Sequence, residues 1–321
     1  MNYIQQAFSG KHEWWRYFIG VLIALIGVGI FSIPHSAAIA MKQLNGDSID
    51  MSKLDDVNYI LTLFEPNLNL FFILLPFVGG IIFLLIAVKY LHKLSFTSLT
   101  TSRKKIDWKR VRFSFLFWGI ISSSMIALDY YMSPEDYIFN FKLVPFIILA
   151  VIAILLVPLQ TSFEEYLFRG YLMQGLGTIA KNRWFPLIMT SVVFGLMHYA
   201  NPEVEKLGMV IMIYYIGTGL FLGIMTLMDE GLELALGFHA ANNLFTALIV
   251  TADWTAFQTH SVLRDTSEPS AGIDILMPVL VIFPIVLLVF SKKYGWTNWK
   301  EKLVGKIEEV VDTDELNELG N

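Results

Sequence analysis

Long stretches of apolar residues without Asp, Glu, Lys or Arg alternate with short charged segments along the whole chain. A helix needs about 20 apolar residues to cross a hydrocarbon layer about 30 Å thick, and most of these stretches reach that length. The third stretch is shorter, and we expect its helix to extend through Asp129 to Tyr131. The pattern predicts an all-α fold, a polytopic transmembrane helix bundle of about eight spans. The stretches are residues 17–41, 66–88, 113–128, 143–163, 184–202, 207–228, 234–252 and 275–291.

Basic residues are distributed unequally between the segments that connect these stretches. Eight spans place both termini on one side of the membrane, and 18 of the 23 Lys and Arg residues fall on that side. Because cytoplasmic segments carry the excess of Lys and Arg, both termini are predicted to be cytoplasmic. We therefore expect a multi-pass protein of a bacterial cytoplasmic (inner) membrane.

The composition agrees with a lipid environment and excludes several kinds of site. Of the 321 residues, 55% are hydrophobic and 16% are charged, whereas soluble domains carry about 25% charged residues. The net charge of −5 provides no basic surface for nucleic acid, so the lipid bilayer is the expected partner and nucleic acid is not. The absence of cysteine excludes disulfides, thiolate catalysis and cysteine-ligated zinc.

A first polar cluster lies at the end of the fourth apolar stretch. Glu165 and Arg169 are four residues apart and share one helix face, whereas Glu164 points about 100° away from Glu165. One carboxylate is thus expected to be paired and the other available. Ionisable groups inside a membrane are costly and therefore indicate function. The alternative is that these residues only mark the cytoplasmic mouth of the span.

Two further polar clusters lie in later stretches. His198 falls within the fifth stretch, and His239 and Asn243 share one helix face in the seventh, with Ala240 and Ala241 between them. The alternative for each is a packing or hydrogen-bonding role between helices. Together with Glu164, however, these residues are the groups needed to activate a water and to stabilise an oxyanion. The His-Glu-x-x-His, Gly-x-Ser-x-Gly and Gly-x-Gly-Asp patterns of other protease classes are absent.

Three motifs in this order resemble the signature of the CAAX protease and bacteriocin-processing (CPBP, or Abi) family of intramembrane endopeptidases. The resemblance covers residues 143 to about 251, and the first three stretches and the tail carry no such signature. It divides the chain into N-terminal helices with a basic loop (1–142), a CPBP-like protease core (143–252) and a last helix with a cytoplasmic tail (253–321). The motifs are Glu164-Glu165-x-x-x-Arg169, Phe194-x-x-x-His198 and His239-x-x-x-Asn243.

The resemblance implies helices around a conical cavity and an endopeptidase that acts on a membrane-embedded peptide or a prenylated, CAAX-like protein. Glu164 with His198 would hold and deprotonate the attacking water, and His239 with Asn243 would stabilise the oxyanion. Glu165 and Arg169 would support them. The alternative function is a non-catalytic polytopic protein: a bacteriocin-immunity factor, a scaffold or a transporter.

Metal dependence is a second open point, because family members have also been described as metalloproteases. Glu164, His198 and His239 could form a His₂Glu zinc site. Three separate spans would each supply one ligand, and the only carboxylate available to orient a histidine is Glu165, which we expect to be committed to Arg169. We therefore favour a glutamate-activated water without a cofactor, with zinc as the alternative.

The motif residues are expected to lie at different depths in the membrane, although a shared site requires them to be level. At 1.5 Å per residue, His198 lies about 21 Å along its helix from Trp184, while Glu164 and His239 lie within about 9 Å of their cytoplasmic edges. We therefore expect either a strong tilt of the fifth span or a segment 170–183 that dips into the membrane.

Overall fold

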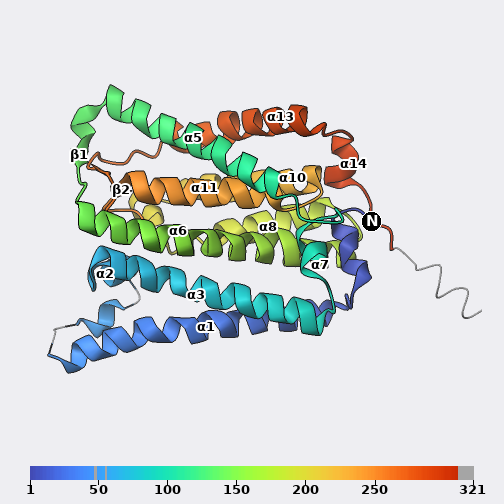
Figure 1. The fold of residues 1–321 in the computed structure, drawn as a ribbon, viewed down its shortest axis with the longest axis horizontal. Helices are drawn as coiled ribbons and strands as arrows, with labels where there is room; N and C mark the ends of the chain where they lie inside the picture. Colours follow the sequence, from blue (N-terminus) through green and yellow to red (C-terminus); the bar gives the residue numbers. More distant parts are fainter. Residues whose placement is uncertain (47–48, 55, 310–321) are drawn as a thin grey trace, which may run out of the picture.

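Long helices lying roughly along one direction make up most of the molecule in the computed structural model, which describes residues 1–46, 49–54 and 56–309 (Figure 1). The predicted all-α helix bundle is confirmed. The helices are η1 (Ile4–Ser9), α1 (Trp14–Leu44), η2 (Met51–Lys53), α2 (Val57–Thr62), α3 (Pro66–Ile86), η3 (Ala87–Leu91), α4 (Phe96–Thr100), α5 (Trp108–Met132), η4 (Pro134–Asp136), α6 (Leu143–Glu165), η5 (Tyr166–Leu172), α7 (Met173–Ala180), α8 (Trp184–Leu196), α9 (Pro202–Leu207), α10 (Ile211–Asp229), α11 (Glu233–Ile249), α12 (Ile273–Met277), η6 (Pro278–Ile282), α13 (Phe283–Tyr294) and α14 (Trp299–Val304).

Within the described residues, six helices are long and apolar enough to cross a membrane. They include α5, which extends to Met132 as expected for the short third stretch. The two other expected spans correspond to shorter helices, α8 with 13 residues and α11 with 17. The chain is thus a multi-pass membrane protein, and eight crossings remain a prediction. The six helices are Trp14–Leu44, Pro66–Leu91, Trp108–Met132, Leu143–Ala180, Ile211–Asp229 and Ile275–Tyr294.

The fifth apolar stretch does not form one helix, contrary to expectation. Helix α8 ends at Leu196, a turn follows, and α9 begins at Pro202. Asn201 has an extended backbone (φ −69°, ψ 147°), because a residue that precedes proline is disfavoured in the helical region. His198 consequently lies in a turn beyond the last helical residue.

The segment 170–183 does not begin as a separate element; it continues the fourth helix through η5 and α7 to Ala180. The continued helix runs about 16 Å beyond Arg169, and α8 then runs back by about 15 Å between Trp184 and Phe194. The guanidinium of Arg169 accordingly lies 4.1 Å over the Phe194 ring. The mismatch in depth arose because the fourth helix extends well beyond its charged residues.

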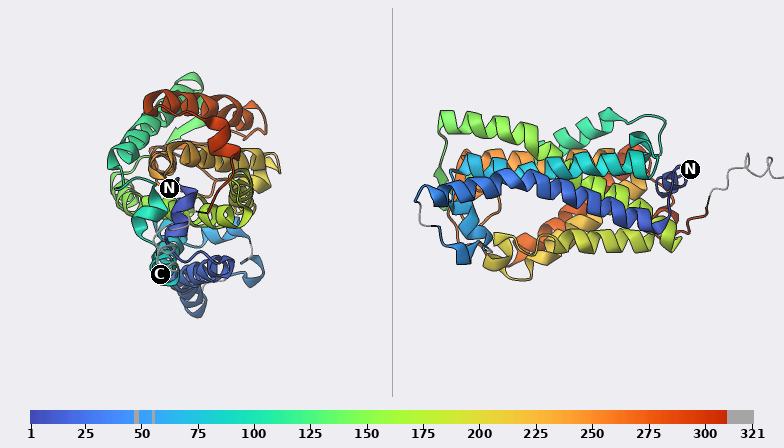
Figure 2. Two further views of the ribbon diagram at one scale, coloured as in Figure 1. Left: turned by 90° about the vertical axis from the view of Figure 1, so that its right-hand side faces the viewer. Right: turned by 90° about the horizontal axis from the view of Figure 1, so that it is seen from below.

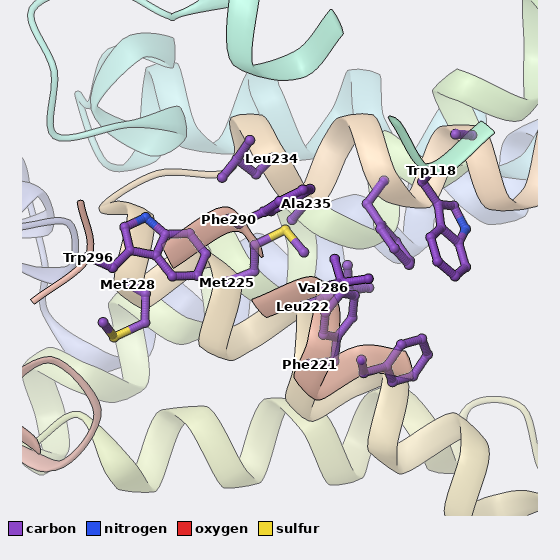
Figure 3. Packing of buried hydrophobic residues seen from close by; sticks show 13 residues of the cluster. Trp118, Phe221, Leu222, Met225, Met228, Leu234, Ala235, Val286, Phe290 and Trp296 are labelled. Carbon is purple, nitrogen blue, oxygen red and sulfur yellow. The ribbon is translucent and has the colours of Figure 1, made fainter. Parts of the chain in front are cut away.

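Helix α11 lies between α5 and α6 and is almost entirely buried along its first half. A Cβ atom at Gly237 would lie 2.2 Å from the carbonyl oxygen of Val111, so only glycine permits this close approach to α5. Aromatic and aliphatic side chains of α5, α10, α11 and α13 fill the space beside it (Figure 3). Helices α1 and α3 form a pair at the opposite edge of the bundle from α13 (Figure 2).

The two ends of the bundle differ. One end carries a small sheet of order β1-β3-β2, in which three-residue strands pair; these strands were not predicted, because they are too short to show an alternating pattern. At the other end η1 lies near α14, and the Gln5 side chain donates a hydrogen bond of 3.0 Å to the Glu308 carbonyl. The described ends of the chain therefore share one end of the bundle; the tail residues 310–321 lie outside the described part. The strands are β1 (Tyr137–Phe139), β2 (Val250–Ala252) and β3 (Leu263–Asp265).

Candidate active site

Glu165 and Arg169 are the two fully buried members of the first motif. Glu165 ends α6, where the helix widens into the π-helical turn η5 that carries Arg169. The side chains of both residues are fully buried, and Arg169 Nη1 lies 2.9 Å from Glu165 Oε1, so the expected i,i+4 ion pair is present. Arg169 Nη2 also donates to the Gly219 carbonyl at 3.2 Å. This pair therefore ties α6 to α10 in the middle of the bundle.

His239 lies between the two adjacent glutamates. Its Nδ1 donates a hydrogen bond of 2.8 Å to Glu165 Oε1, and its Nε2 lies 3.6 Å from Glu164 Oε2. Glu165 thus holds His239 as well as Arg169, and the expectation that Glu165 serves Arg169 alone is wrong. The residues of the first and third motifs meet because α6 and α11 pack side by side.

Glu164 is held differently from its neighbour, as the sequence predicted. Its Oε1 accepts a hydrogen bond of 2.7 Å from Gln160 Nε2, and its side chain is 12% exposed, against 0% for Glu165. The second oxygen, Oε2, is buried and has no hydrogen bond within the described residues. Glu164 therefore keeps an acceptor oxygen beside His239 that no described group uses.

His198 lies in the turn after α8 and lines a cavity there. Its Nδ1 donates to the Phe194 carbonyl at 2.8 Å, and its ring stacks on Tyr215 with centroids 4.5 Å apart and planes at 20°. In a neutral imidazole this hydrogen bond leaves a lone pair on Nε2. His198, His239 and Asn243 line one cavity of about 70 Å³. No described contact joins His198 to Glu164, so the structure brings Glu164 together with His239 instead.

The polar link between Asn243 and Glu164 runs through Gln160. Asn243 Nδ2 donates to Gln160 Oε1 at 3.2 Å, and Gln160 in turn donates to Glu164. The neighbouring amide of Asn242 donates to Asn243 Oδ1 at 3.2 Å. Asn243 therefore stands at the cavity wall with its amide group oriented by two other side chains.

The start of α11 is fixed by buried ion pairs at the end of the bundle that carries the chain termini. Arg103 lies 3.0 Å from Asp229 and 3.1 Å from Glu233, and both carboxylates are almost fully buried. Asp229 ends α10 and Glu233 begins α11, so one guanidinium clamps the turn between the two helices. This clamp holds the first turn of α11, the helix that carries His239 and Asn243 further along.

The donor set does not fit a metal in this geometry. In the part of the chain that the structure describes, no three His, Asp or Glu side chains lie close enough together to hold a metal ion. The pairing of His239 Nδ1 with Glu165 does match how a carboxylate orients a ligand histidine. Glu165 thus orients His239 as well as pairing with Arg169.

Four residues around the site had no assigned role in the sequence analysis: Gln160, Asn242, Tyr215 and Glu203. Glu203 accepts a hydrogen bond of 2.9 Å from the Ala256 amide, and its Oε2 is buried without one. Burial raises the pKa of Glu203, with opposing contributions from the Ala256 amide and from His198. Gln160 and Asn242 could have been found by their helical spacing from Glu164 and His239, whereas Tyr215 and Glu203 are brought in only by the fold.

Comparison with known proteins supports the resemblance. Residues 142–245, which carry the seven motif residues and Gln160, match the family described as "Type II CAAX prenyl endopeptidase Rce1-like". The chain is 30% identical over 253 residues to the uncharacterized protein YyaK of Bacillus subtilis (strain 168), an alignment that covers 78% of this chain and 83% of that protein. No solved structure matches. With its motif residues gathered at one buried site, this membrane-spanning chain belongs to the CPBP family of CAAX-type intramembrane proteases.

Proposed function

We propose that this protein is an endopeptidase that hydrolyses a peptide bond of a membrane-embedded or prenylated, CAAX-like peptide. The observation that carries the proposal is the buried Glu164 Oε2, which has no hydrogen bond to any described residue and lies 3.6 Å from His239 Nε2. A carboxylate and an imidazole in this arrangement can hold a water between them and take its proton. Because the site lies among helices that span the membrane, the substrate would reach it from the bilayer.

The proposed hydrolysis begins with deprotonation of a water and ends with protonation of the leaving amine. Glu164 Oε2 takes a proton from the water, whose oxygen attacks the carbonyl carbon of the peptide while the π electrons move onto the carbonyl oxygen. The second N–H of the Asn243 amide donates to that oxyanion. Collapse of the intermediate breaks the C–N bond, and the proton held by Glu164 passes to the leaving amine.

The two histidines take neighbouring roles at the cavity. Glu165 holds Nδ1–H of His239, which directs Nε2 towards Glu164 and the reacting water. His198, with Nδ1–H bound to the Phe194 carbonyl, presents Nε2 to the same cavity and can hold the water or the carbonyl from the other side. This assignment keeps the residues that the family resemblance implies but places His239 beside the base.

The decisive experiment is turnover by the purified full-length protein, reconstituted in liposomes, of a library of membrane peptides with and without a prenyl group. Glu164→Gln should abolish cleavage, because the amide cannot take a proton but still accepts from Gln160. Glu205→Gln is the matched control, since Glu205 is an exposed carboxylate on α9 that contacts Asn58. Equal turnover of all three proteins would exclude Glu164 as the base. No turnover by any of them would favour the non-catalytic alternative: an immunity factor, a scaffold or a transporter.

We further propose that the protein lies in a bacterial cytoplasmic membrane. We also propose that the reaction needs no bound metal, which is supported by the absence of a three-ligand cluster among the described His, Asp and Glu side chains. Elemental analysis of active protein, and activity after exhaustive chelation, test it. One zinc per chain, lost together with activity and restored only by zinc, would overturn the glutamate mechanism.

A further inference from the structure

A single file of hydrogen bonds runs from helix α5 to Glu164. It begins at the indole of Trp118, whose Nε1 donates to Asn242 Oδ1 at 3.0 Å, and passes through the Asn242, Asn243 and Gln160 amides. It ends at Glu164 Oε1, which accepts from Gln160 at 2.7 Å. Trp118 lies on α5, outside the residues 142–245 that match the family.

Every bond in this file points the same way. An indole N–H can only donate, so Trp118 requires the oxygen of Asn242 to face it and turns the Asn242 NH₂ group towards Asn243. Each following amide accepts on its oxygen and donates from its nitrogen, until the file reaches a carboxylate oxygen, which accepts. The chemistry of the two ends thus fixes the orientation of three amides that could otherwise rotate by 180°.

We infer that Trp118, Asn242 and Gln160 are positioning residues, which act through Glu164 and Asn243 on the reaction proposed above. The file occupies Glu164 Oε1 and leaves Oε2 available to the water. It also occupies one N–H of Asn243 and leaves the second N–H for the oxyanion. A reversed Asn243 amide would present an oxygen to the developing negative charge.

Burial stabilises this orientation of the three amides. Trp118 and Gln160 are each 5% exposed, and the Trp118 ring stacks on Phe238 with centroids 4.3 Å apart. A buried polar group that lacks a partner destabilises the fold, so a file in which each member has at least one hydrogen bond favours one arrangement. Helix α5 thereby contributes to the active site without touching the substrate.

The activity test uses Trp118→Phe, which keeps an aromatic ring against Phe238 and removes the donor. We expect kcat to fall about three- to tenfold, the usual effect of one lost hydrogen bond, with KM unchanged. Trp296→Phe is the matched control: Trp296 belongs to the same hydrophobic cluster and its indole donates to Asp229, remote from the file. It should leave kcat unchanged. In a Gln160→Met background, which already cuts the link to Glu164 but leaves Trp118 joined to Asn243, Trp118→Phe should cost less than it does alone.

A second measurement does not depend on peptidase activity. The indole N–H resonances of ¹⁵N-tryptophan-labelled protein in nanodiscs are assigned from the signals lost in Trp118→Phe and Trp296→Phe. Glu164→Gln and Gln160→Met should each shift the Trp118 signal and leave the Trp296 signal in place. An unmoved Trp118 signal, or multiplicative losses of kcat in the double variant, would overturn the inference. Failure of wild-type protein to cleave any peptide, with the Trp118 signal shifting as expected, would refute the proposed function alone.

Discussion

His239 Nδ1 lies 2.8 Å from Glu165 Oε1, the same oxygen that lies 2.9 Å from Arg169 Nη1. One buried carboxylate oxygen therefore holds both a histidine at the cavity and an arginine packed between helices. Glu165 links the stability of the bundle to the orientation of the imidazole, and a change at this residue affects both. Glu164, one position earlier, has no such double role.

Substitution of the two glutamates should separate activity from stability. Glu164→Gln is expected to abolish cleavage with little change in thermal stability, because Gln160 can still donate to the remaining oxygen. Glu165→Gln should lower stability by about 3–5 kcal/mol, the usual cost of breaking a buried ion pair. Thermal unfolding in detergent and peptide turnover measure the two effects. Equal losses of both properties in both variants would show that both residues are structural.

Because α5 and α11 pack closely, a single methyl group added between them should lower stability and turnover. Gly237→Ala places a Cβ 2.2 Å from the Val111 carbonyl, so the helices must separate, at a cost of about 1–3 kcal/mol. Turnover should fall as well, since His239 lies two residues further along α11. Gly29→Ala in α1 is the control, because its Cβ meets no atom within 4 Å. Identical melting temperatures for the two variants would contradict the described packing.

The raised pKa of Glu203 predicts that the stability of the protein depends on pH. Burial raises this pKa above the ordinary value of 4.5, so folding favours the protonated form. Its contribution is fully present below the unfolded pKa and is lost as the pH rises through the folded pKa. The melting temperature of wild type should therefore fall, relative to Glu203→Gln, as the pH rises above 4.5. Glu205→Gln, an exposed change on the same helix, should show no such difference from wild type.

The orientation of the bundle in the membrane can be tested with fusions. Reporters placed within 100–105 should be cytoplasmic and those near Thr266 external, because the basic segments share the end where the described termini lie. A reporter after Asn321 tests the carboxyl terminus, which lies outside the described residues. An external carboxyl terminus would refute the model of eight spans with both termini cytoplasmic.

The sequence predicted the fold class well because membrane helices carry a strong local signal. A long apolar run specifies a helix wherever its partners lie, and each of the eight runs contains one. The ends of the helices were harder to predict. Helix α8 ends at Leu196, inside an apolar run, and the fourth helix continues to Ala180, past the charged residues that end its run, so apolar composition marks neither end.

Within the site, the sequence by itself determined what lies within one helical turn: the Glu165–Arg169 ion pair and the different directions of Glu164 and Glu165. Fixed helical geometry requires both. Which glutamates His239 would face was decided only by the tertiary structure, as was the file of hydrogen bonds that reaches Glu164 from Trp118. Those contacts depend on how α5, α6 and α11 approach one another. That approach is set by small residues such as Gly237 and by the summed packing of many side chains, which no local spacing encodes.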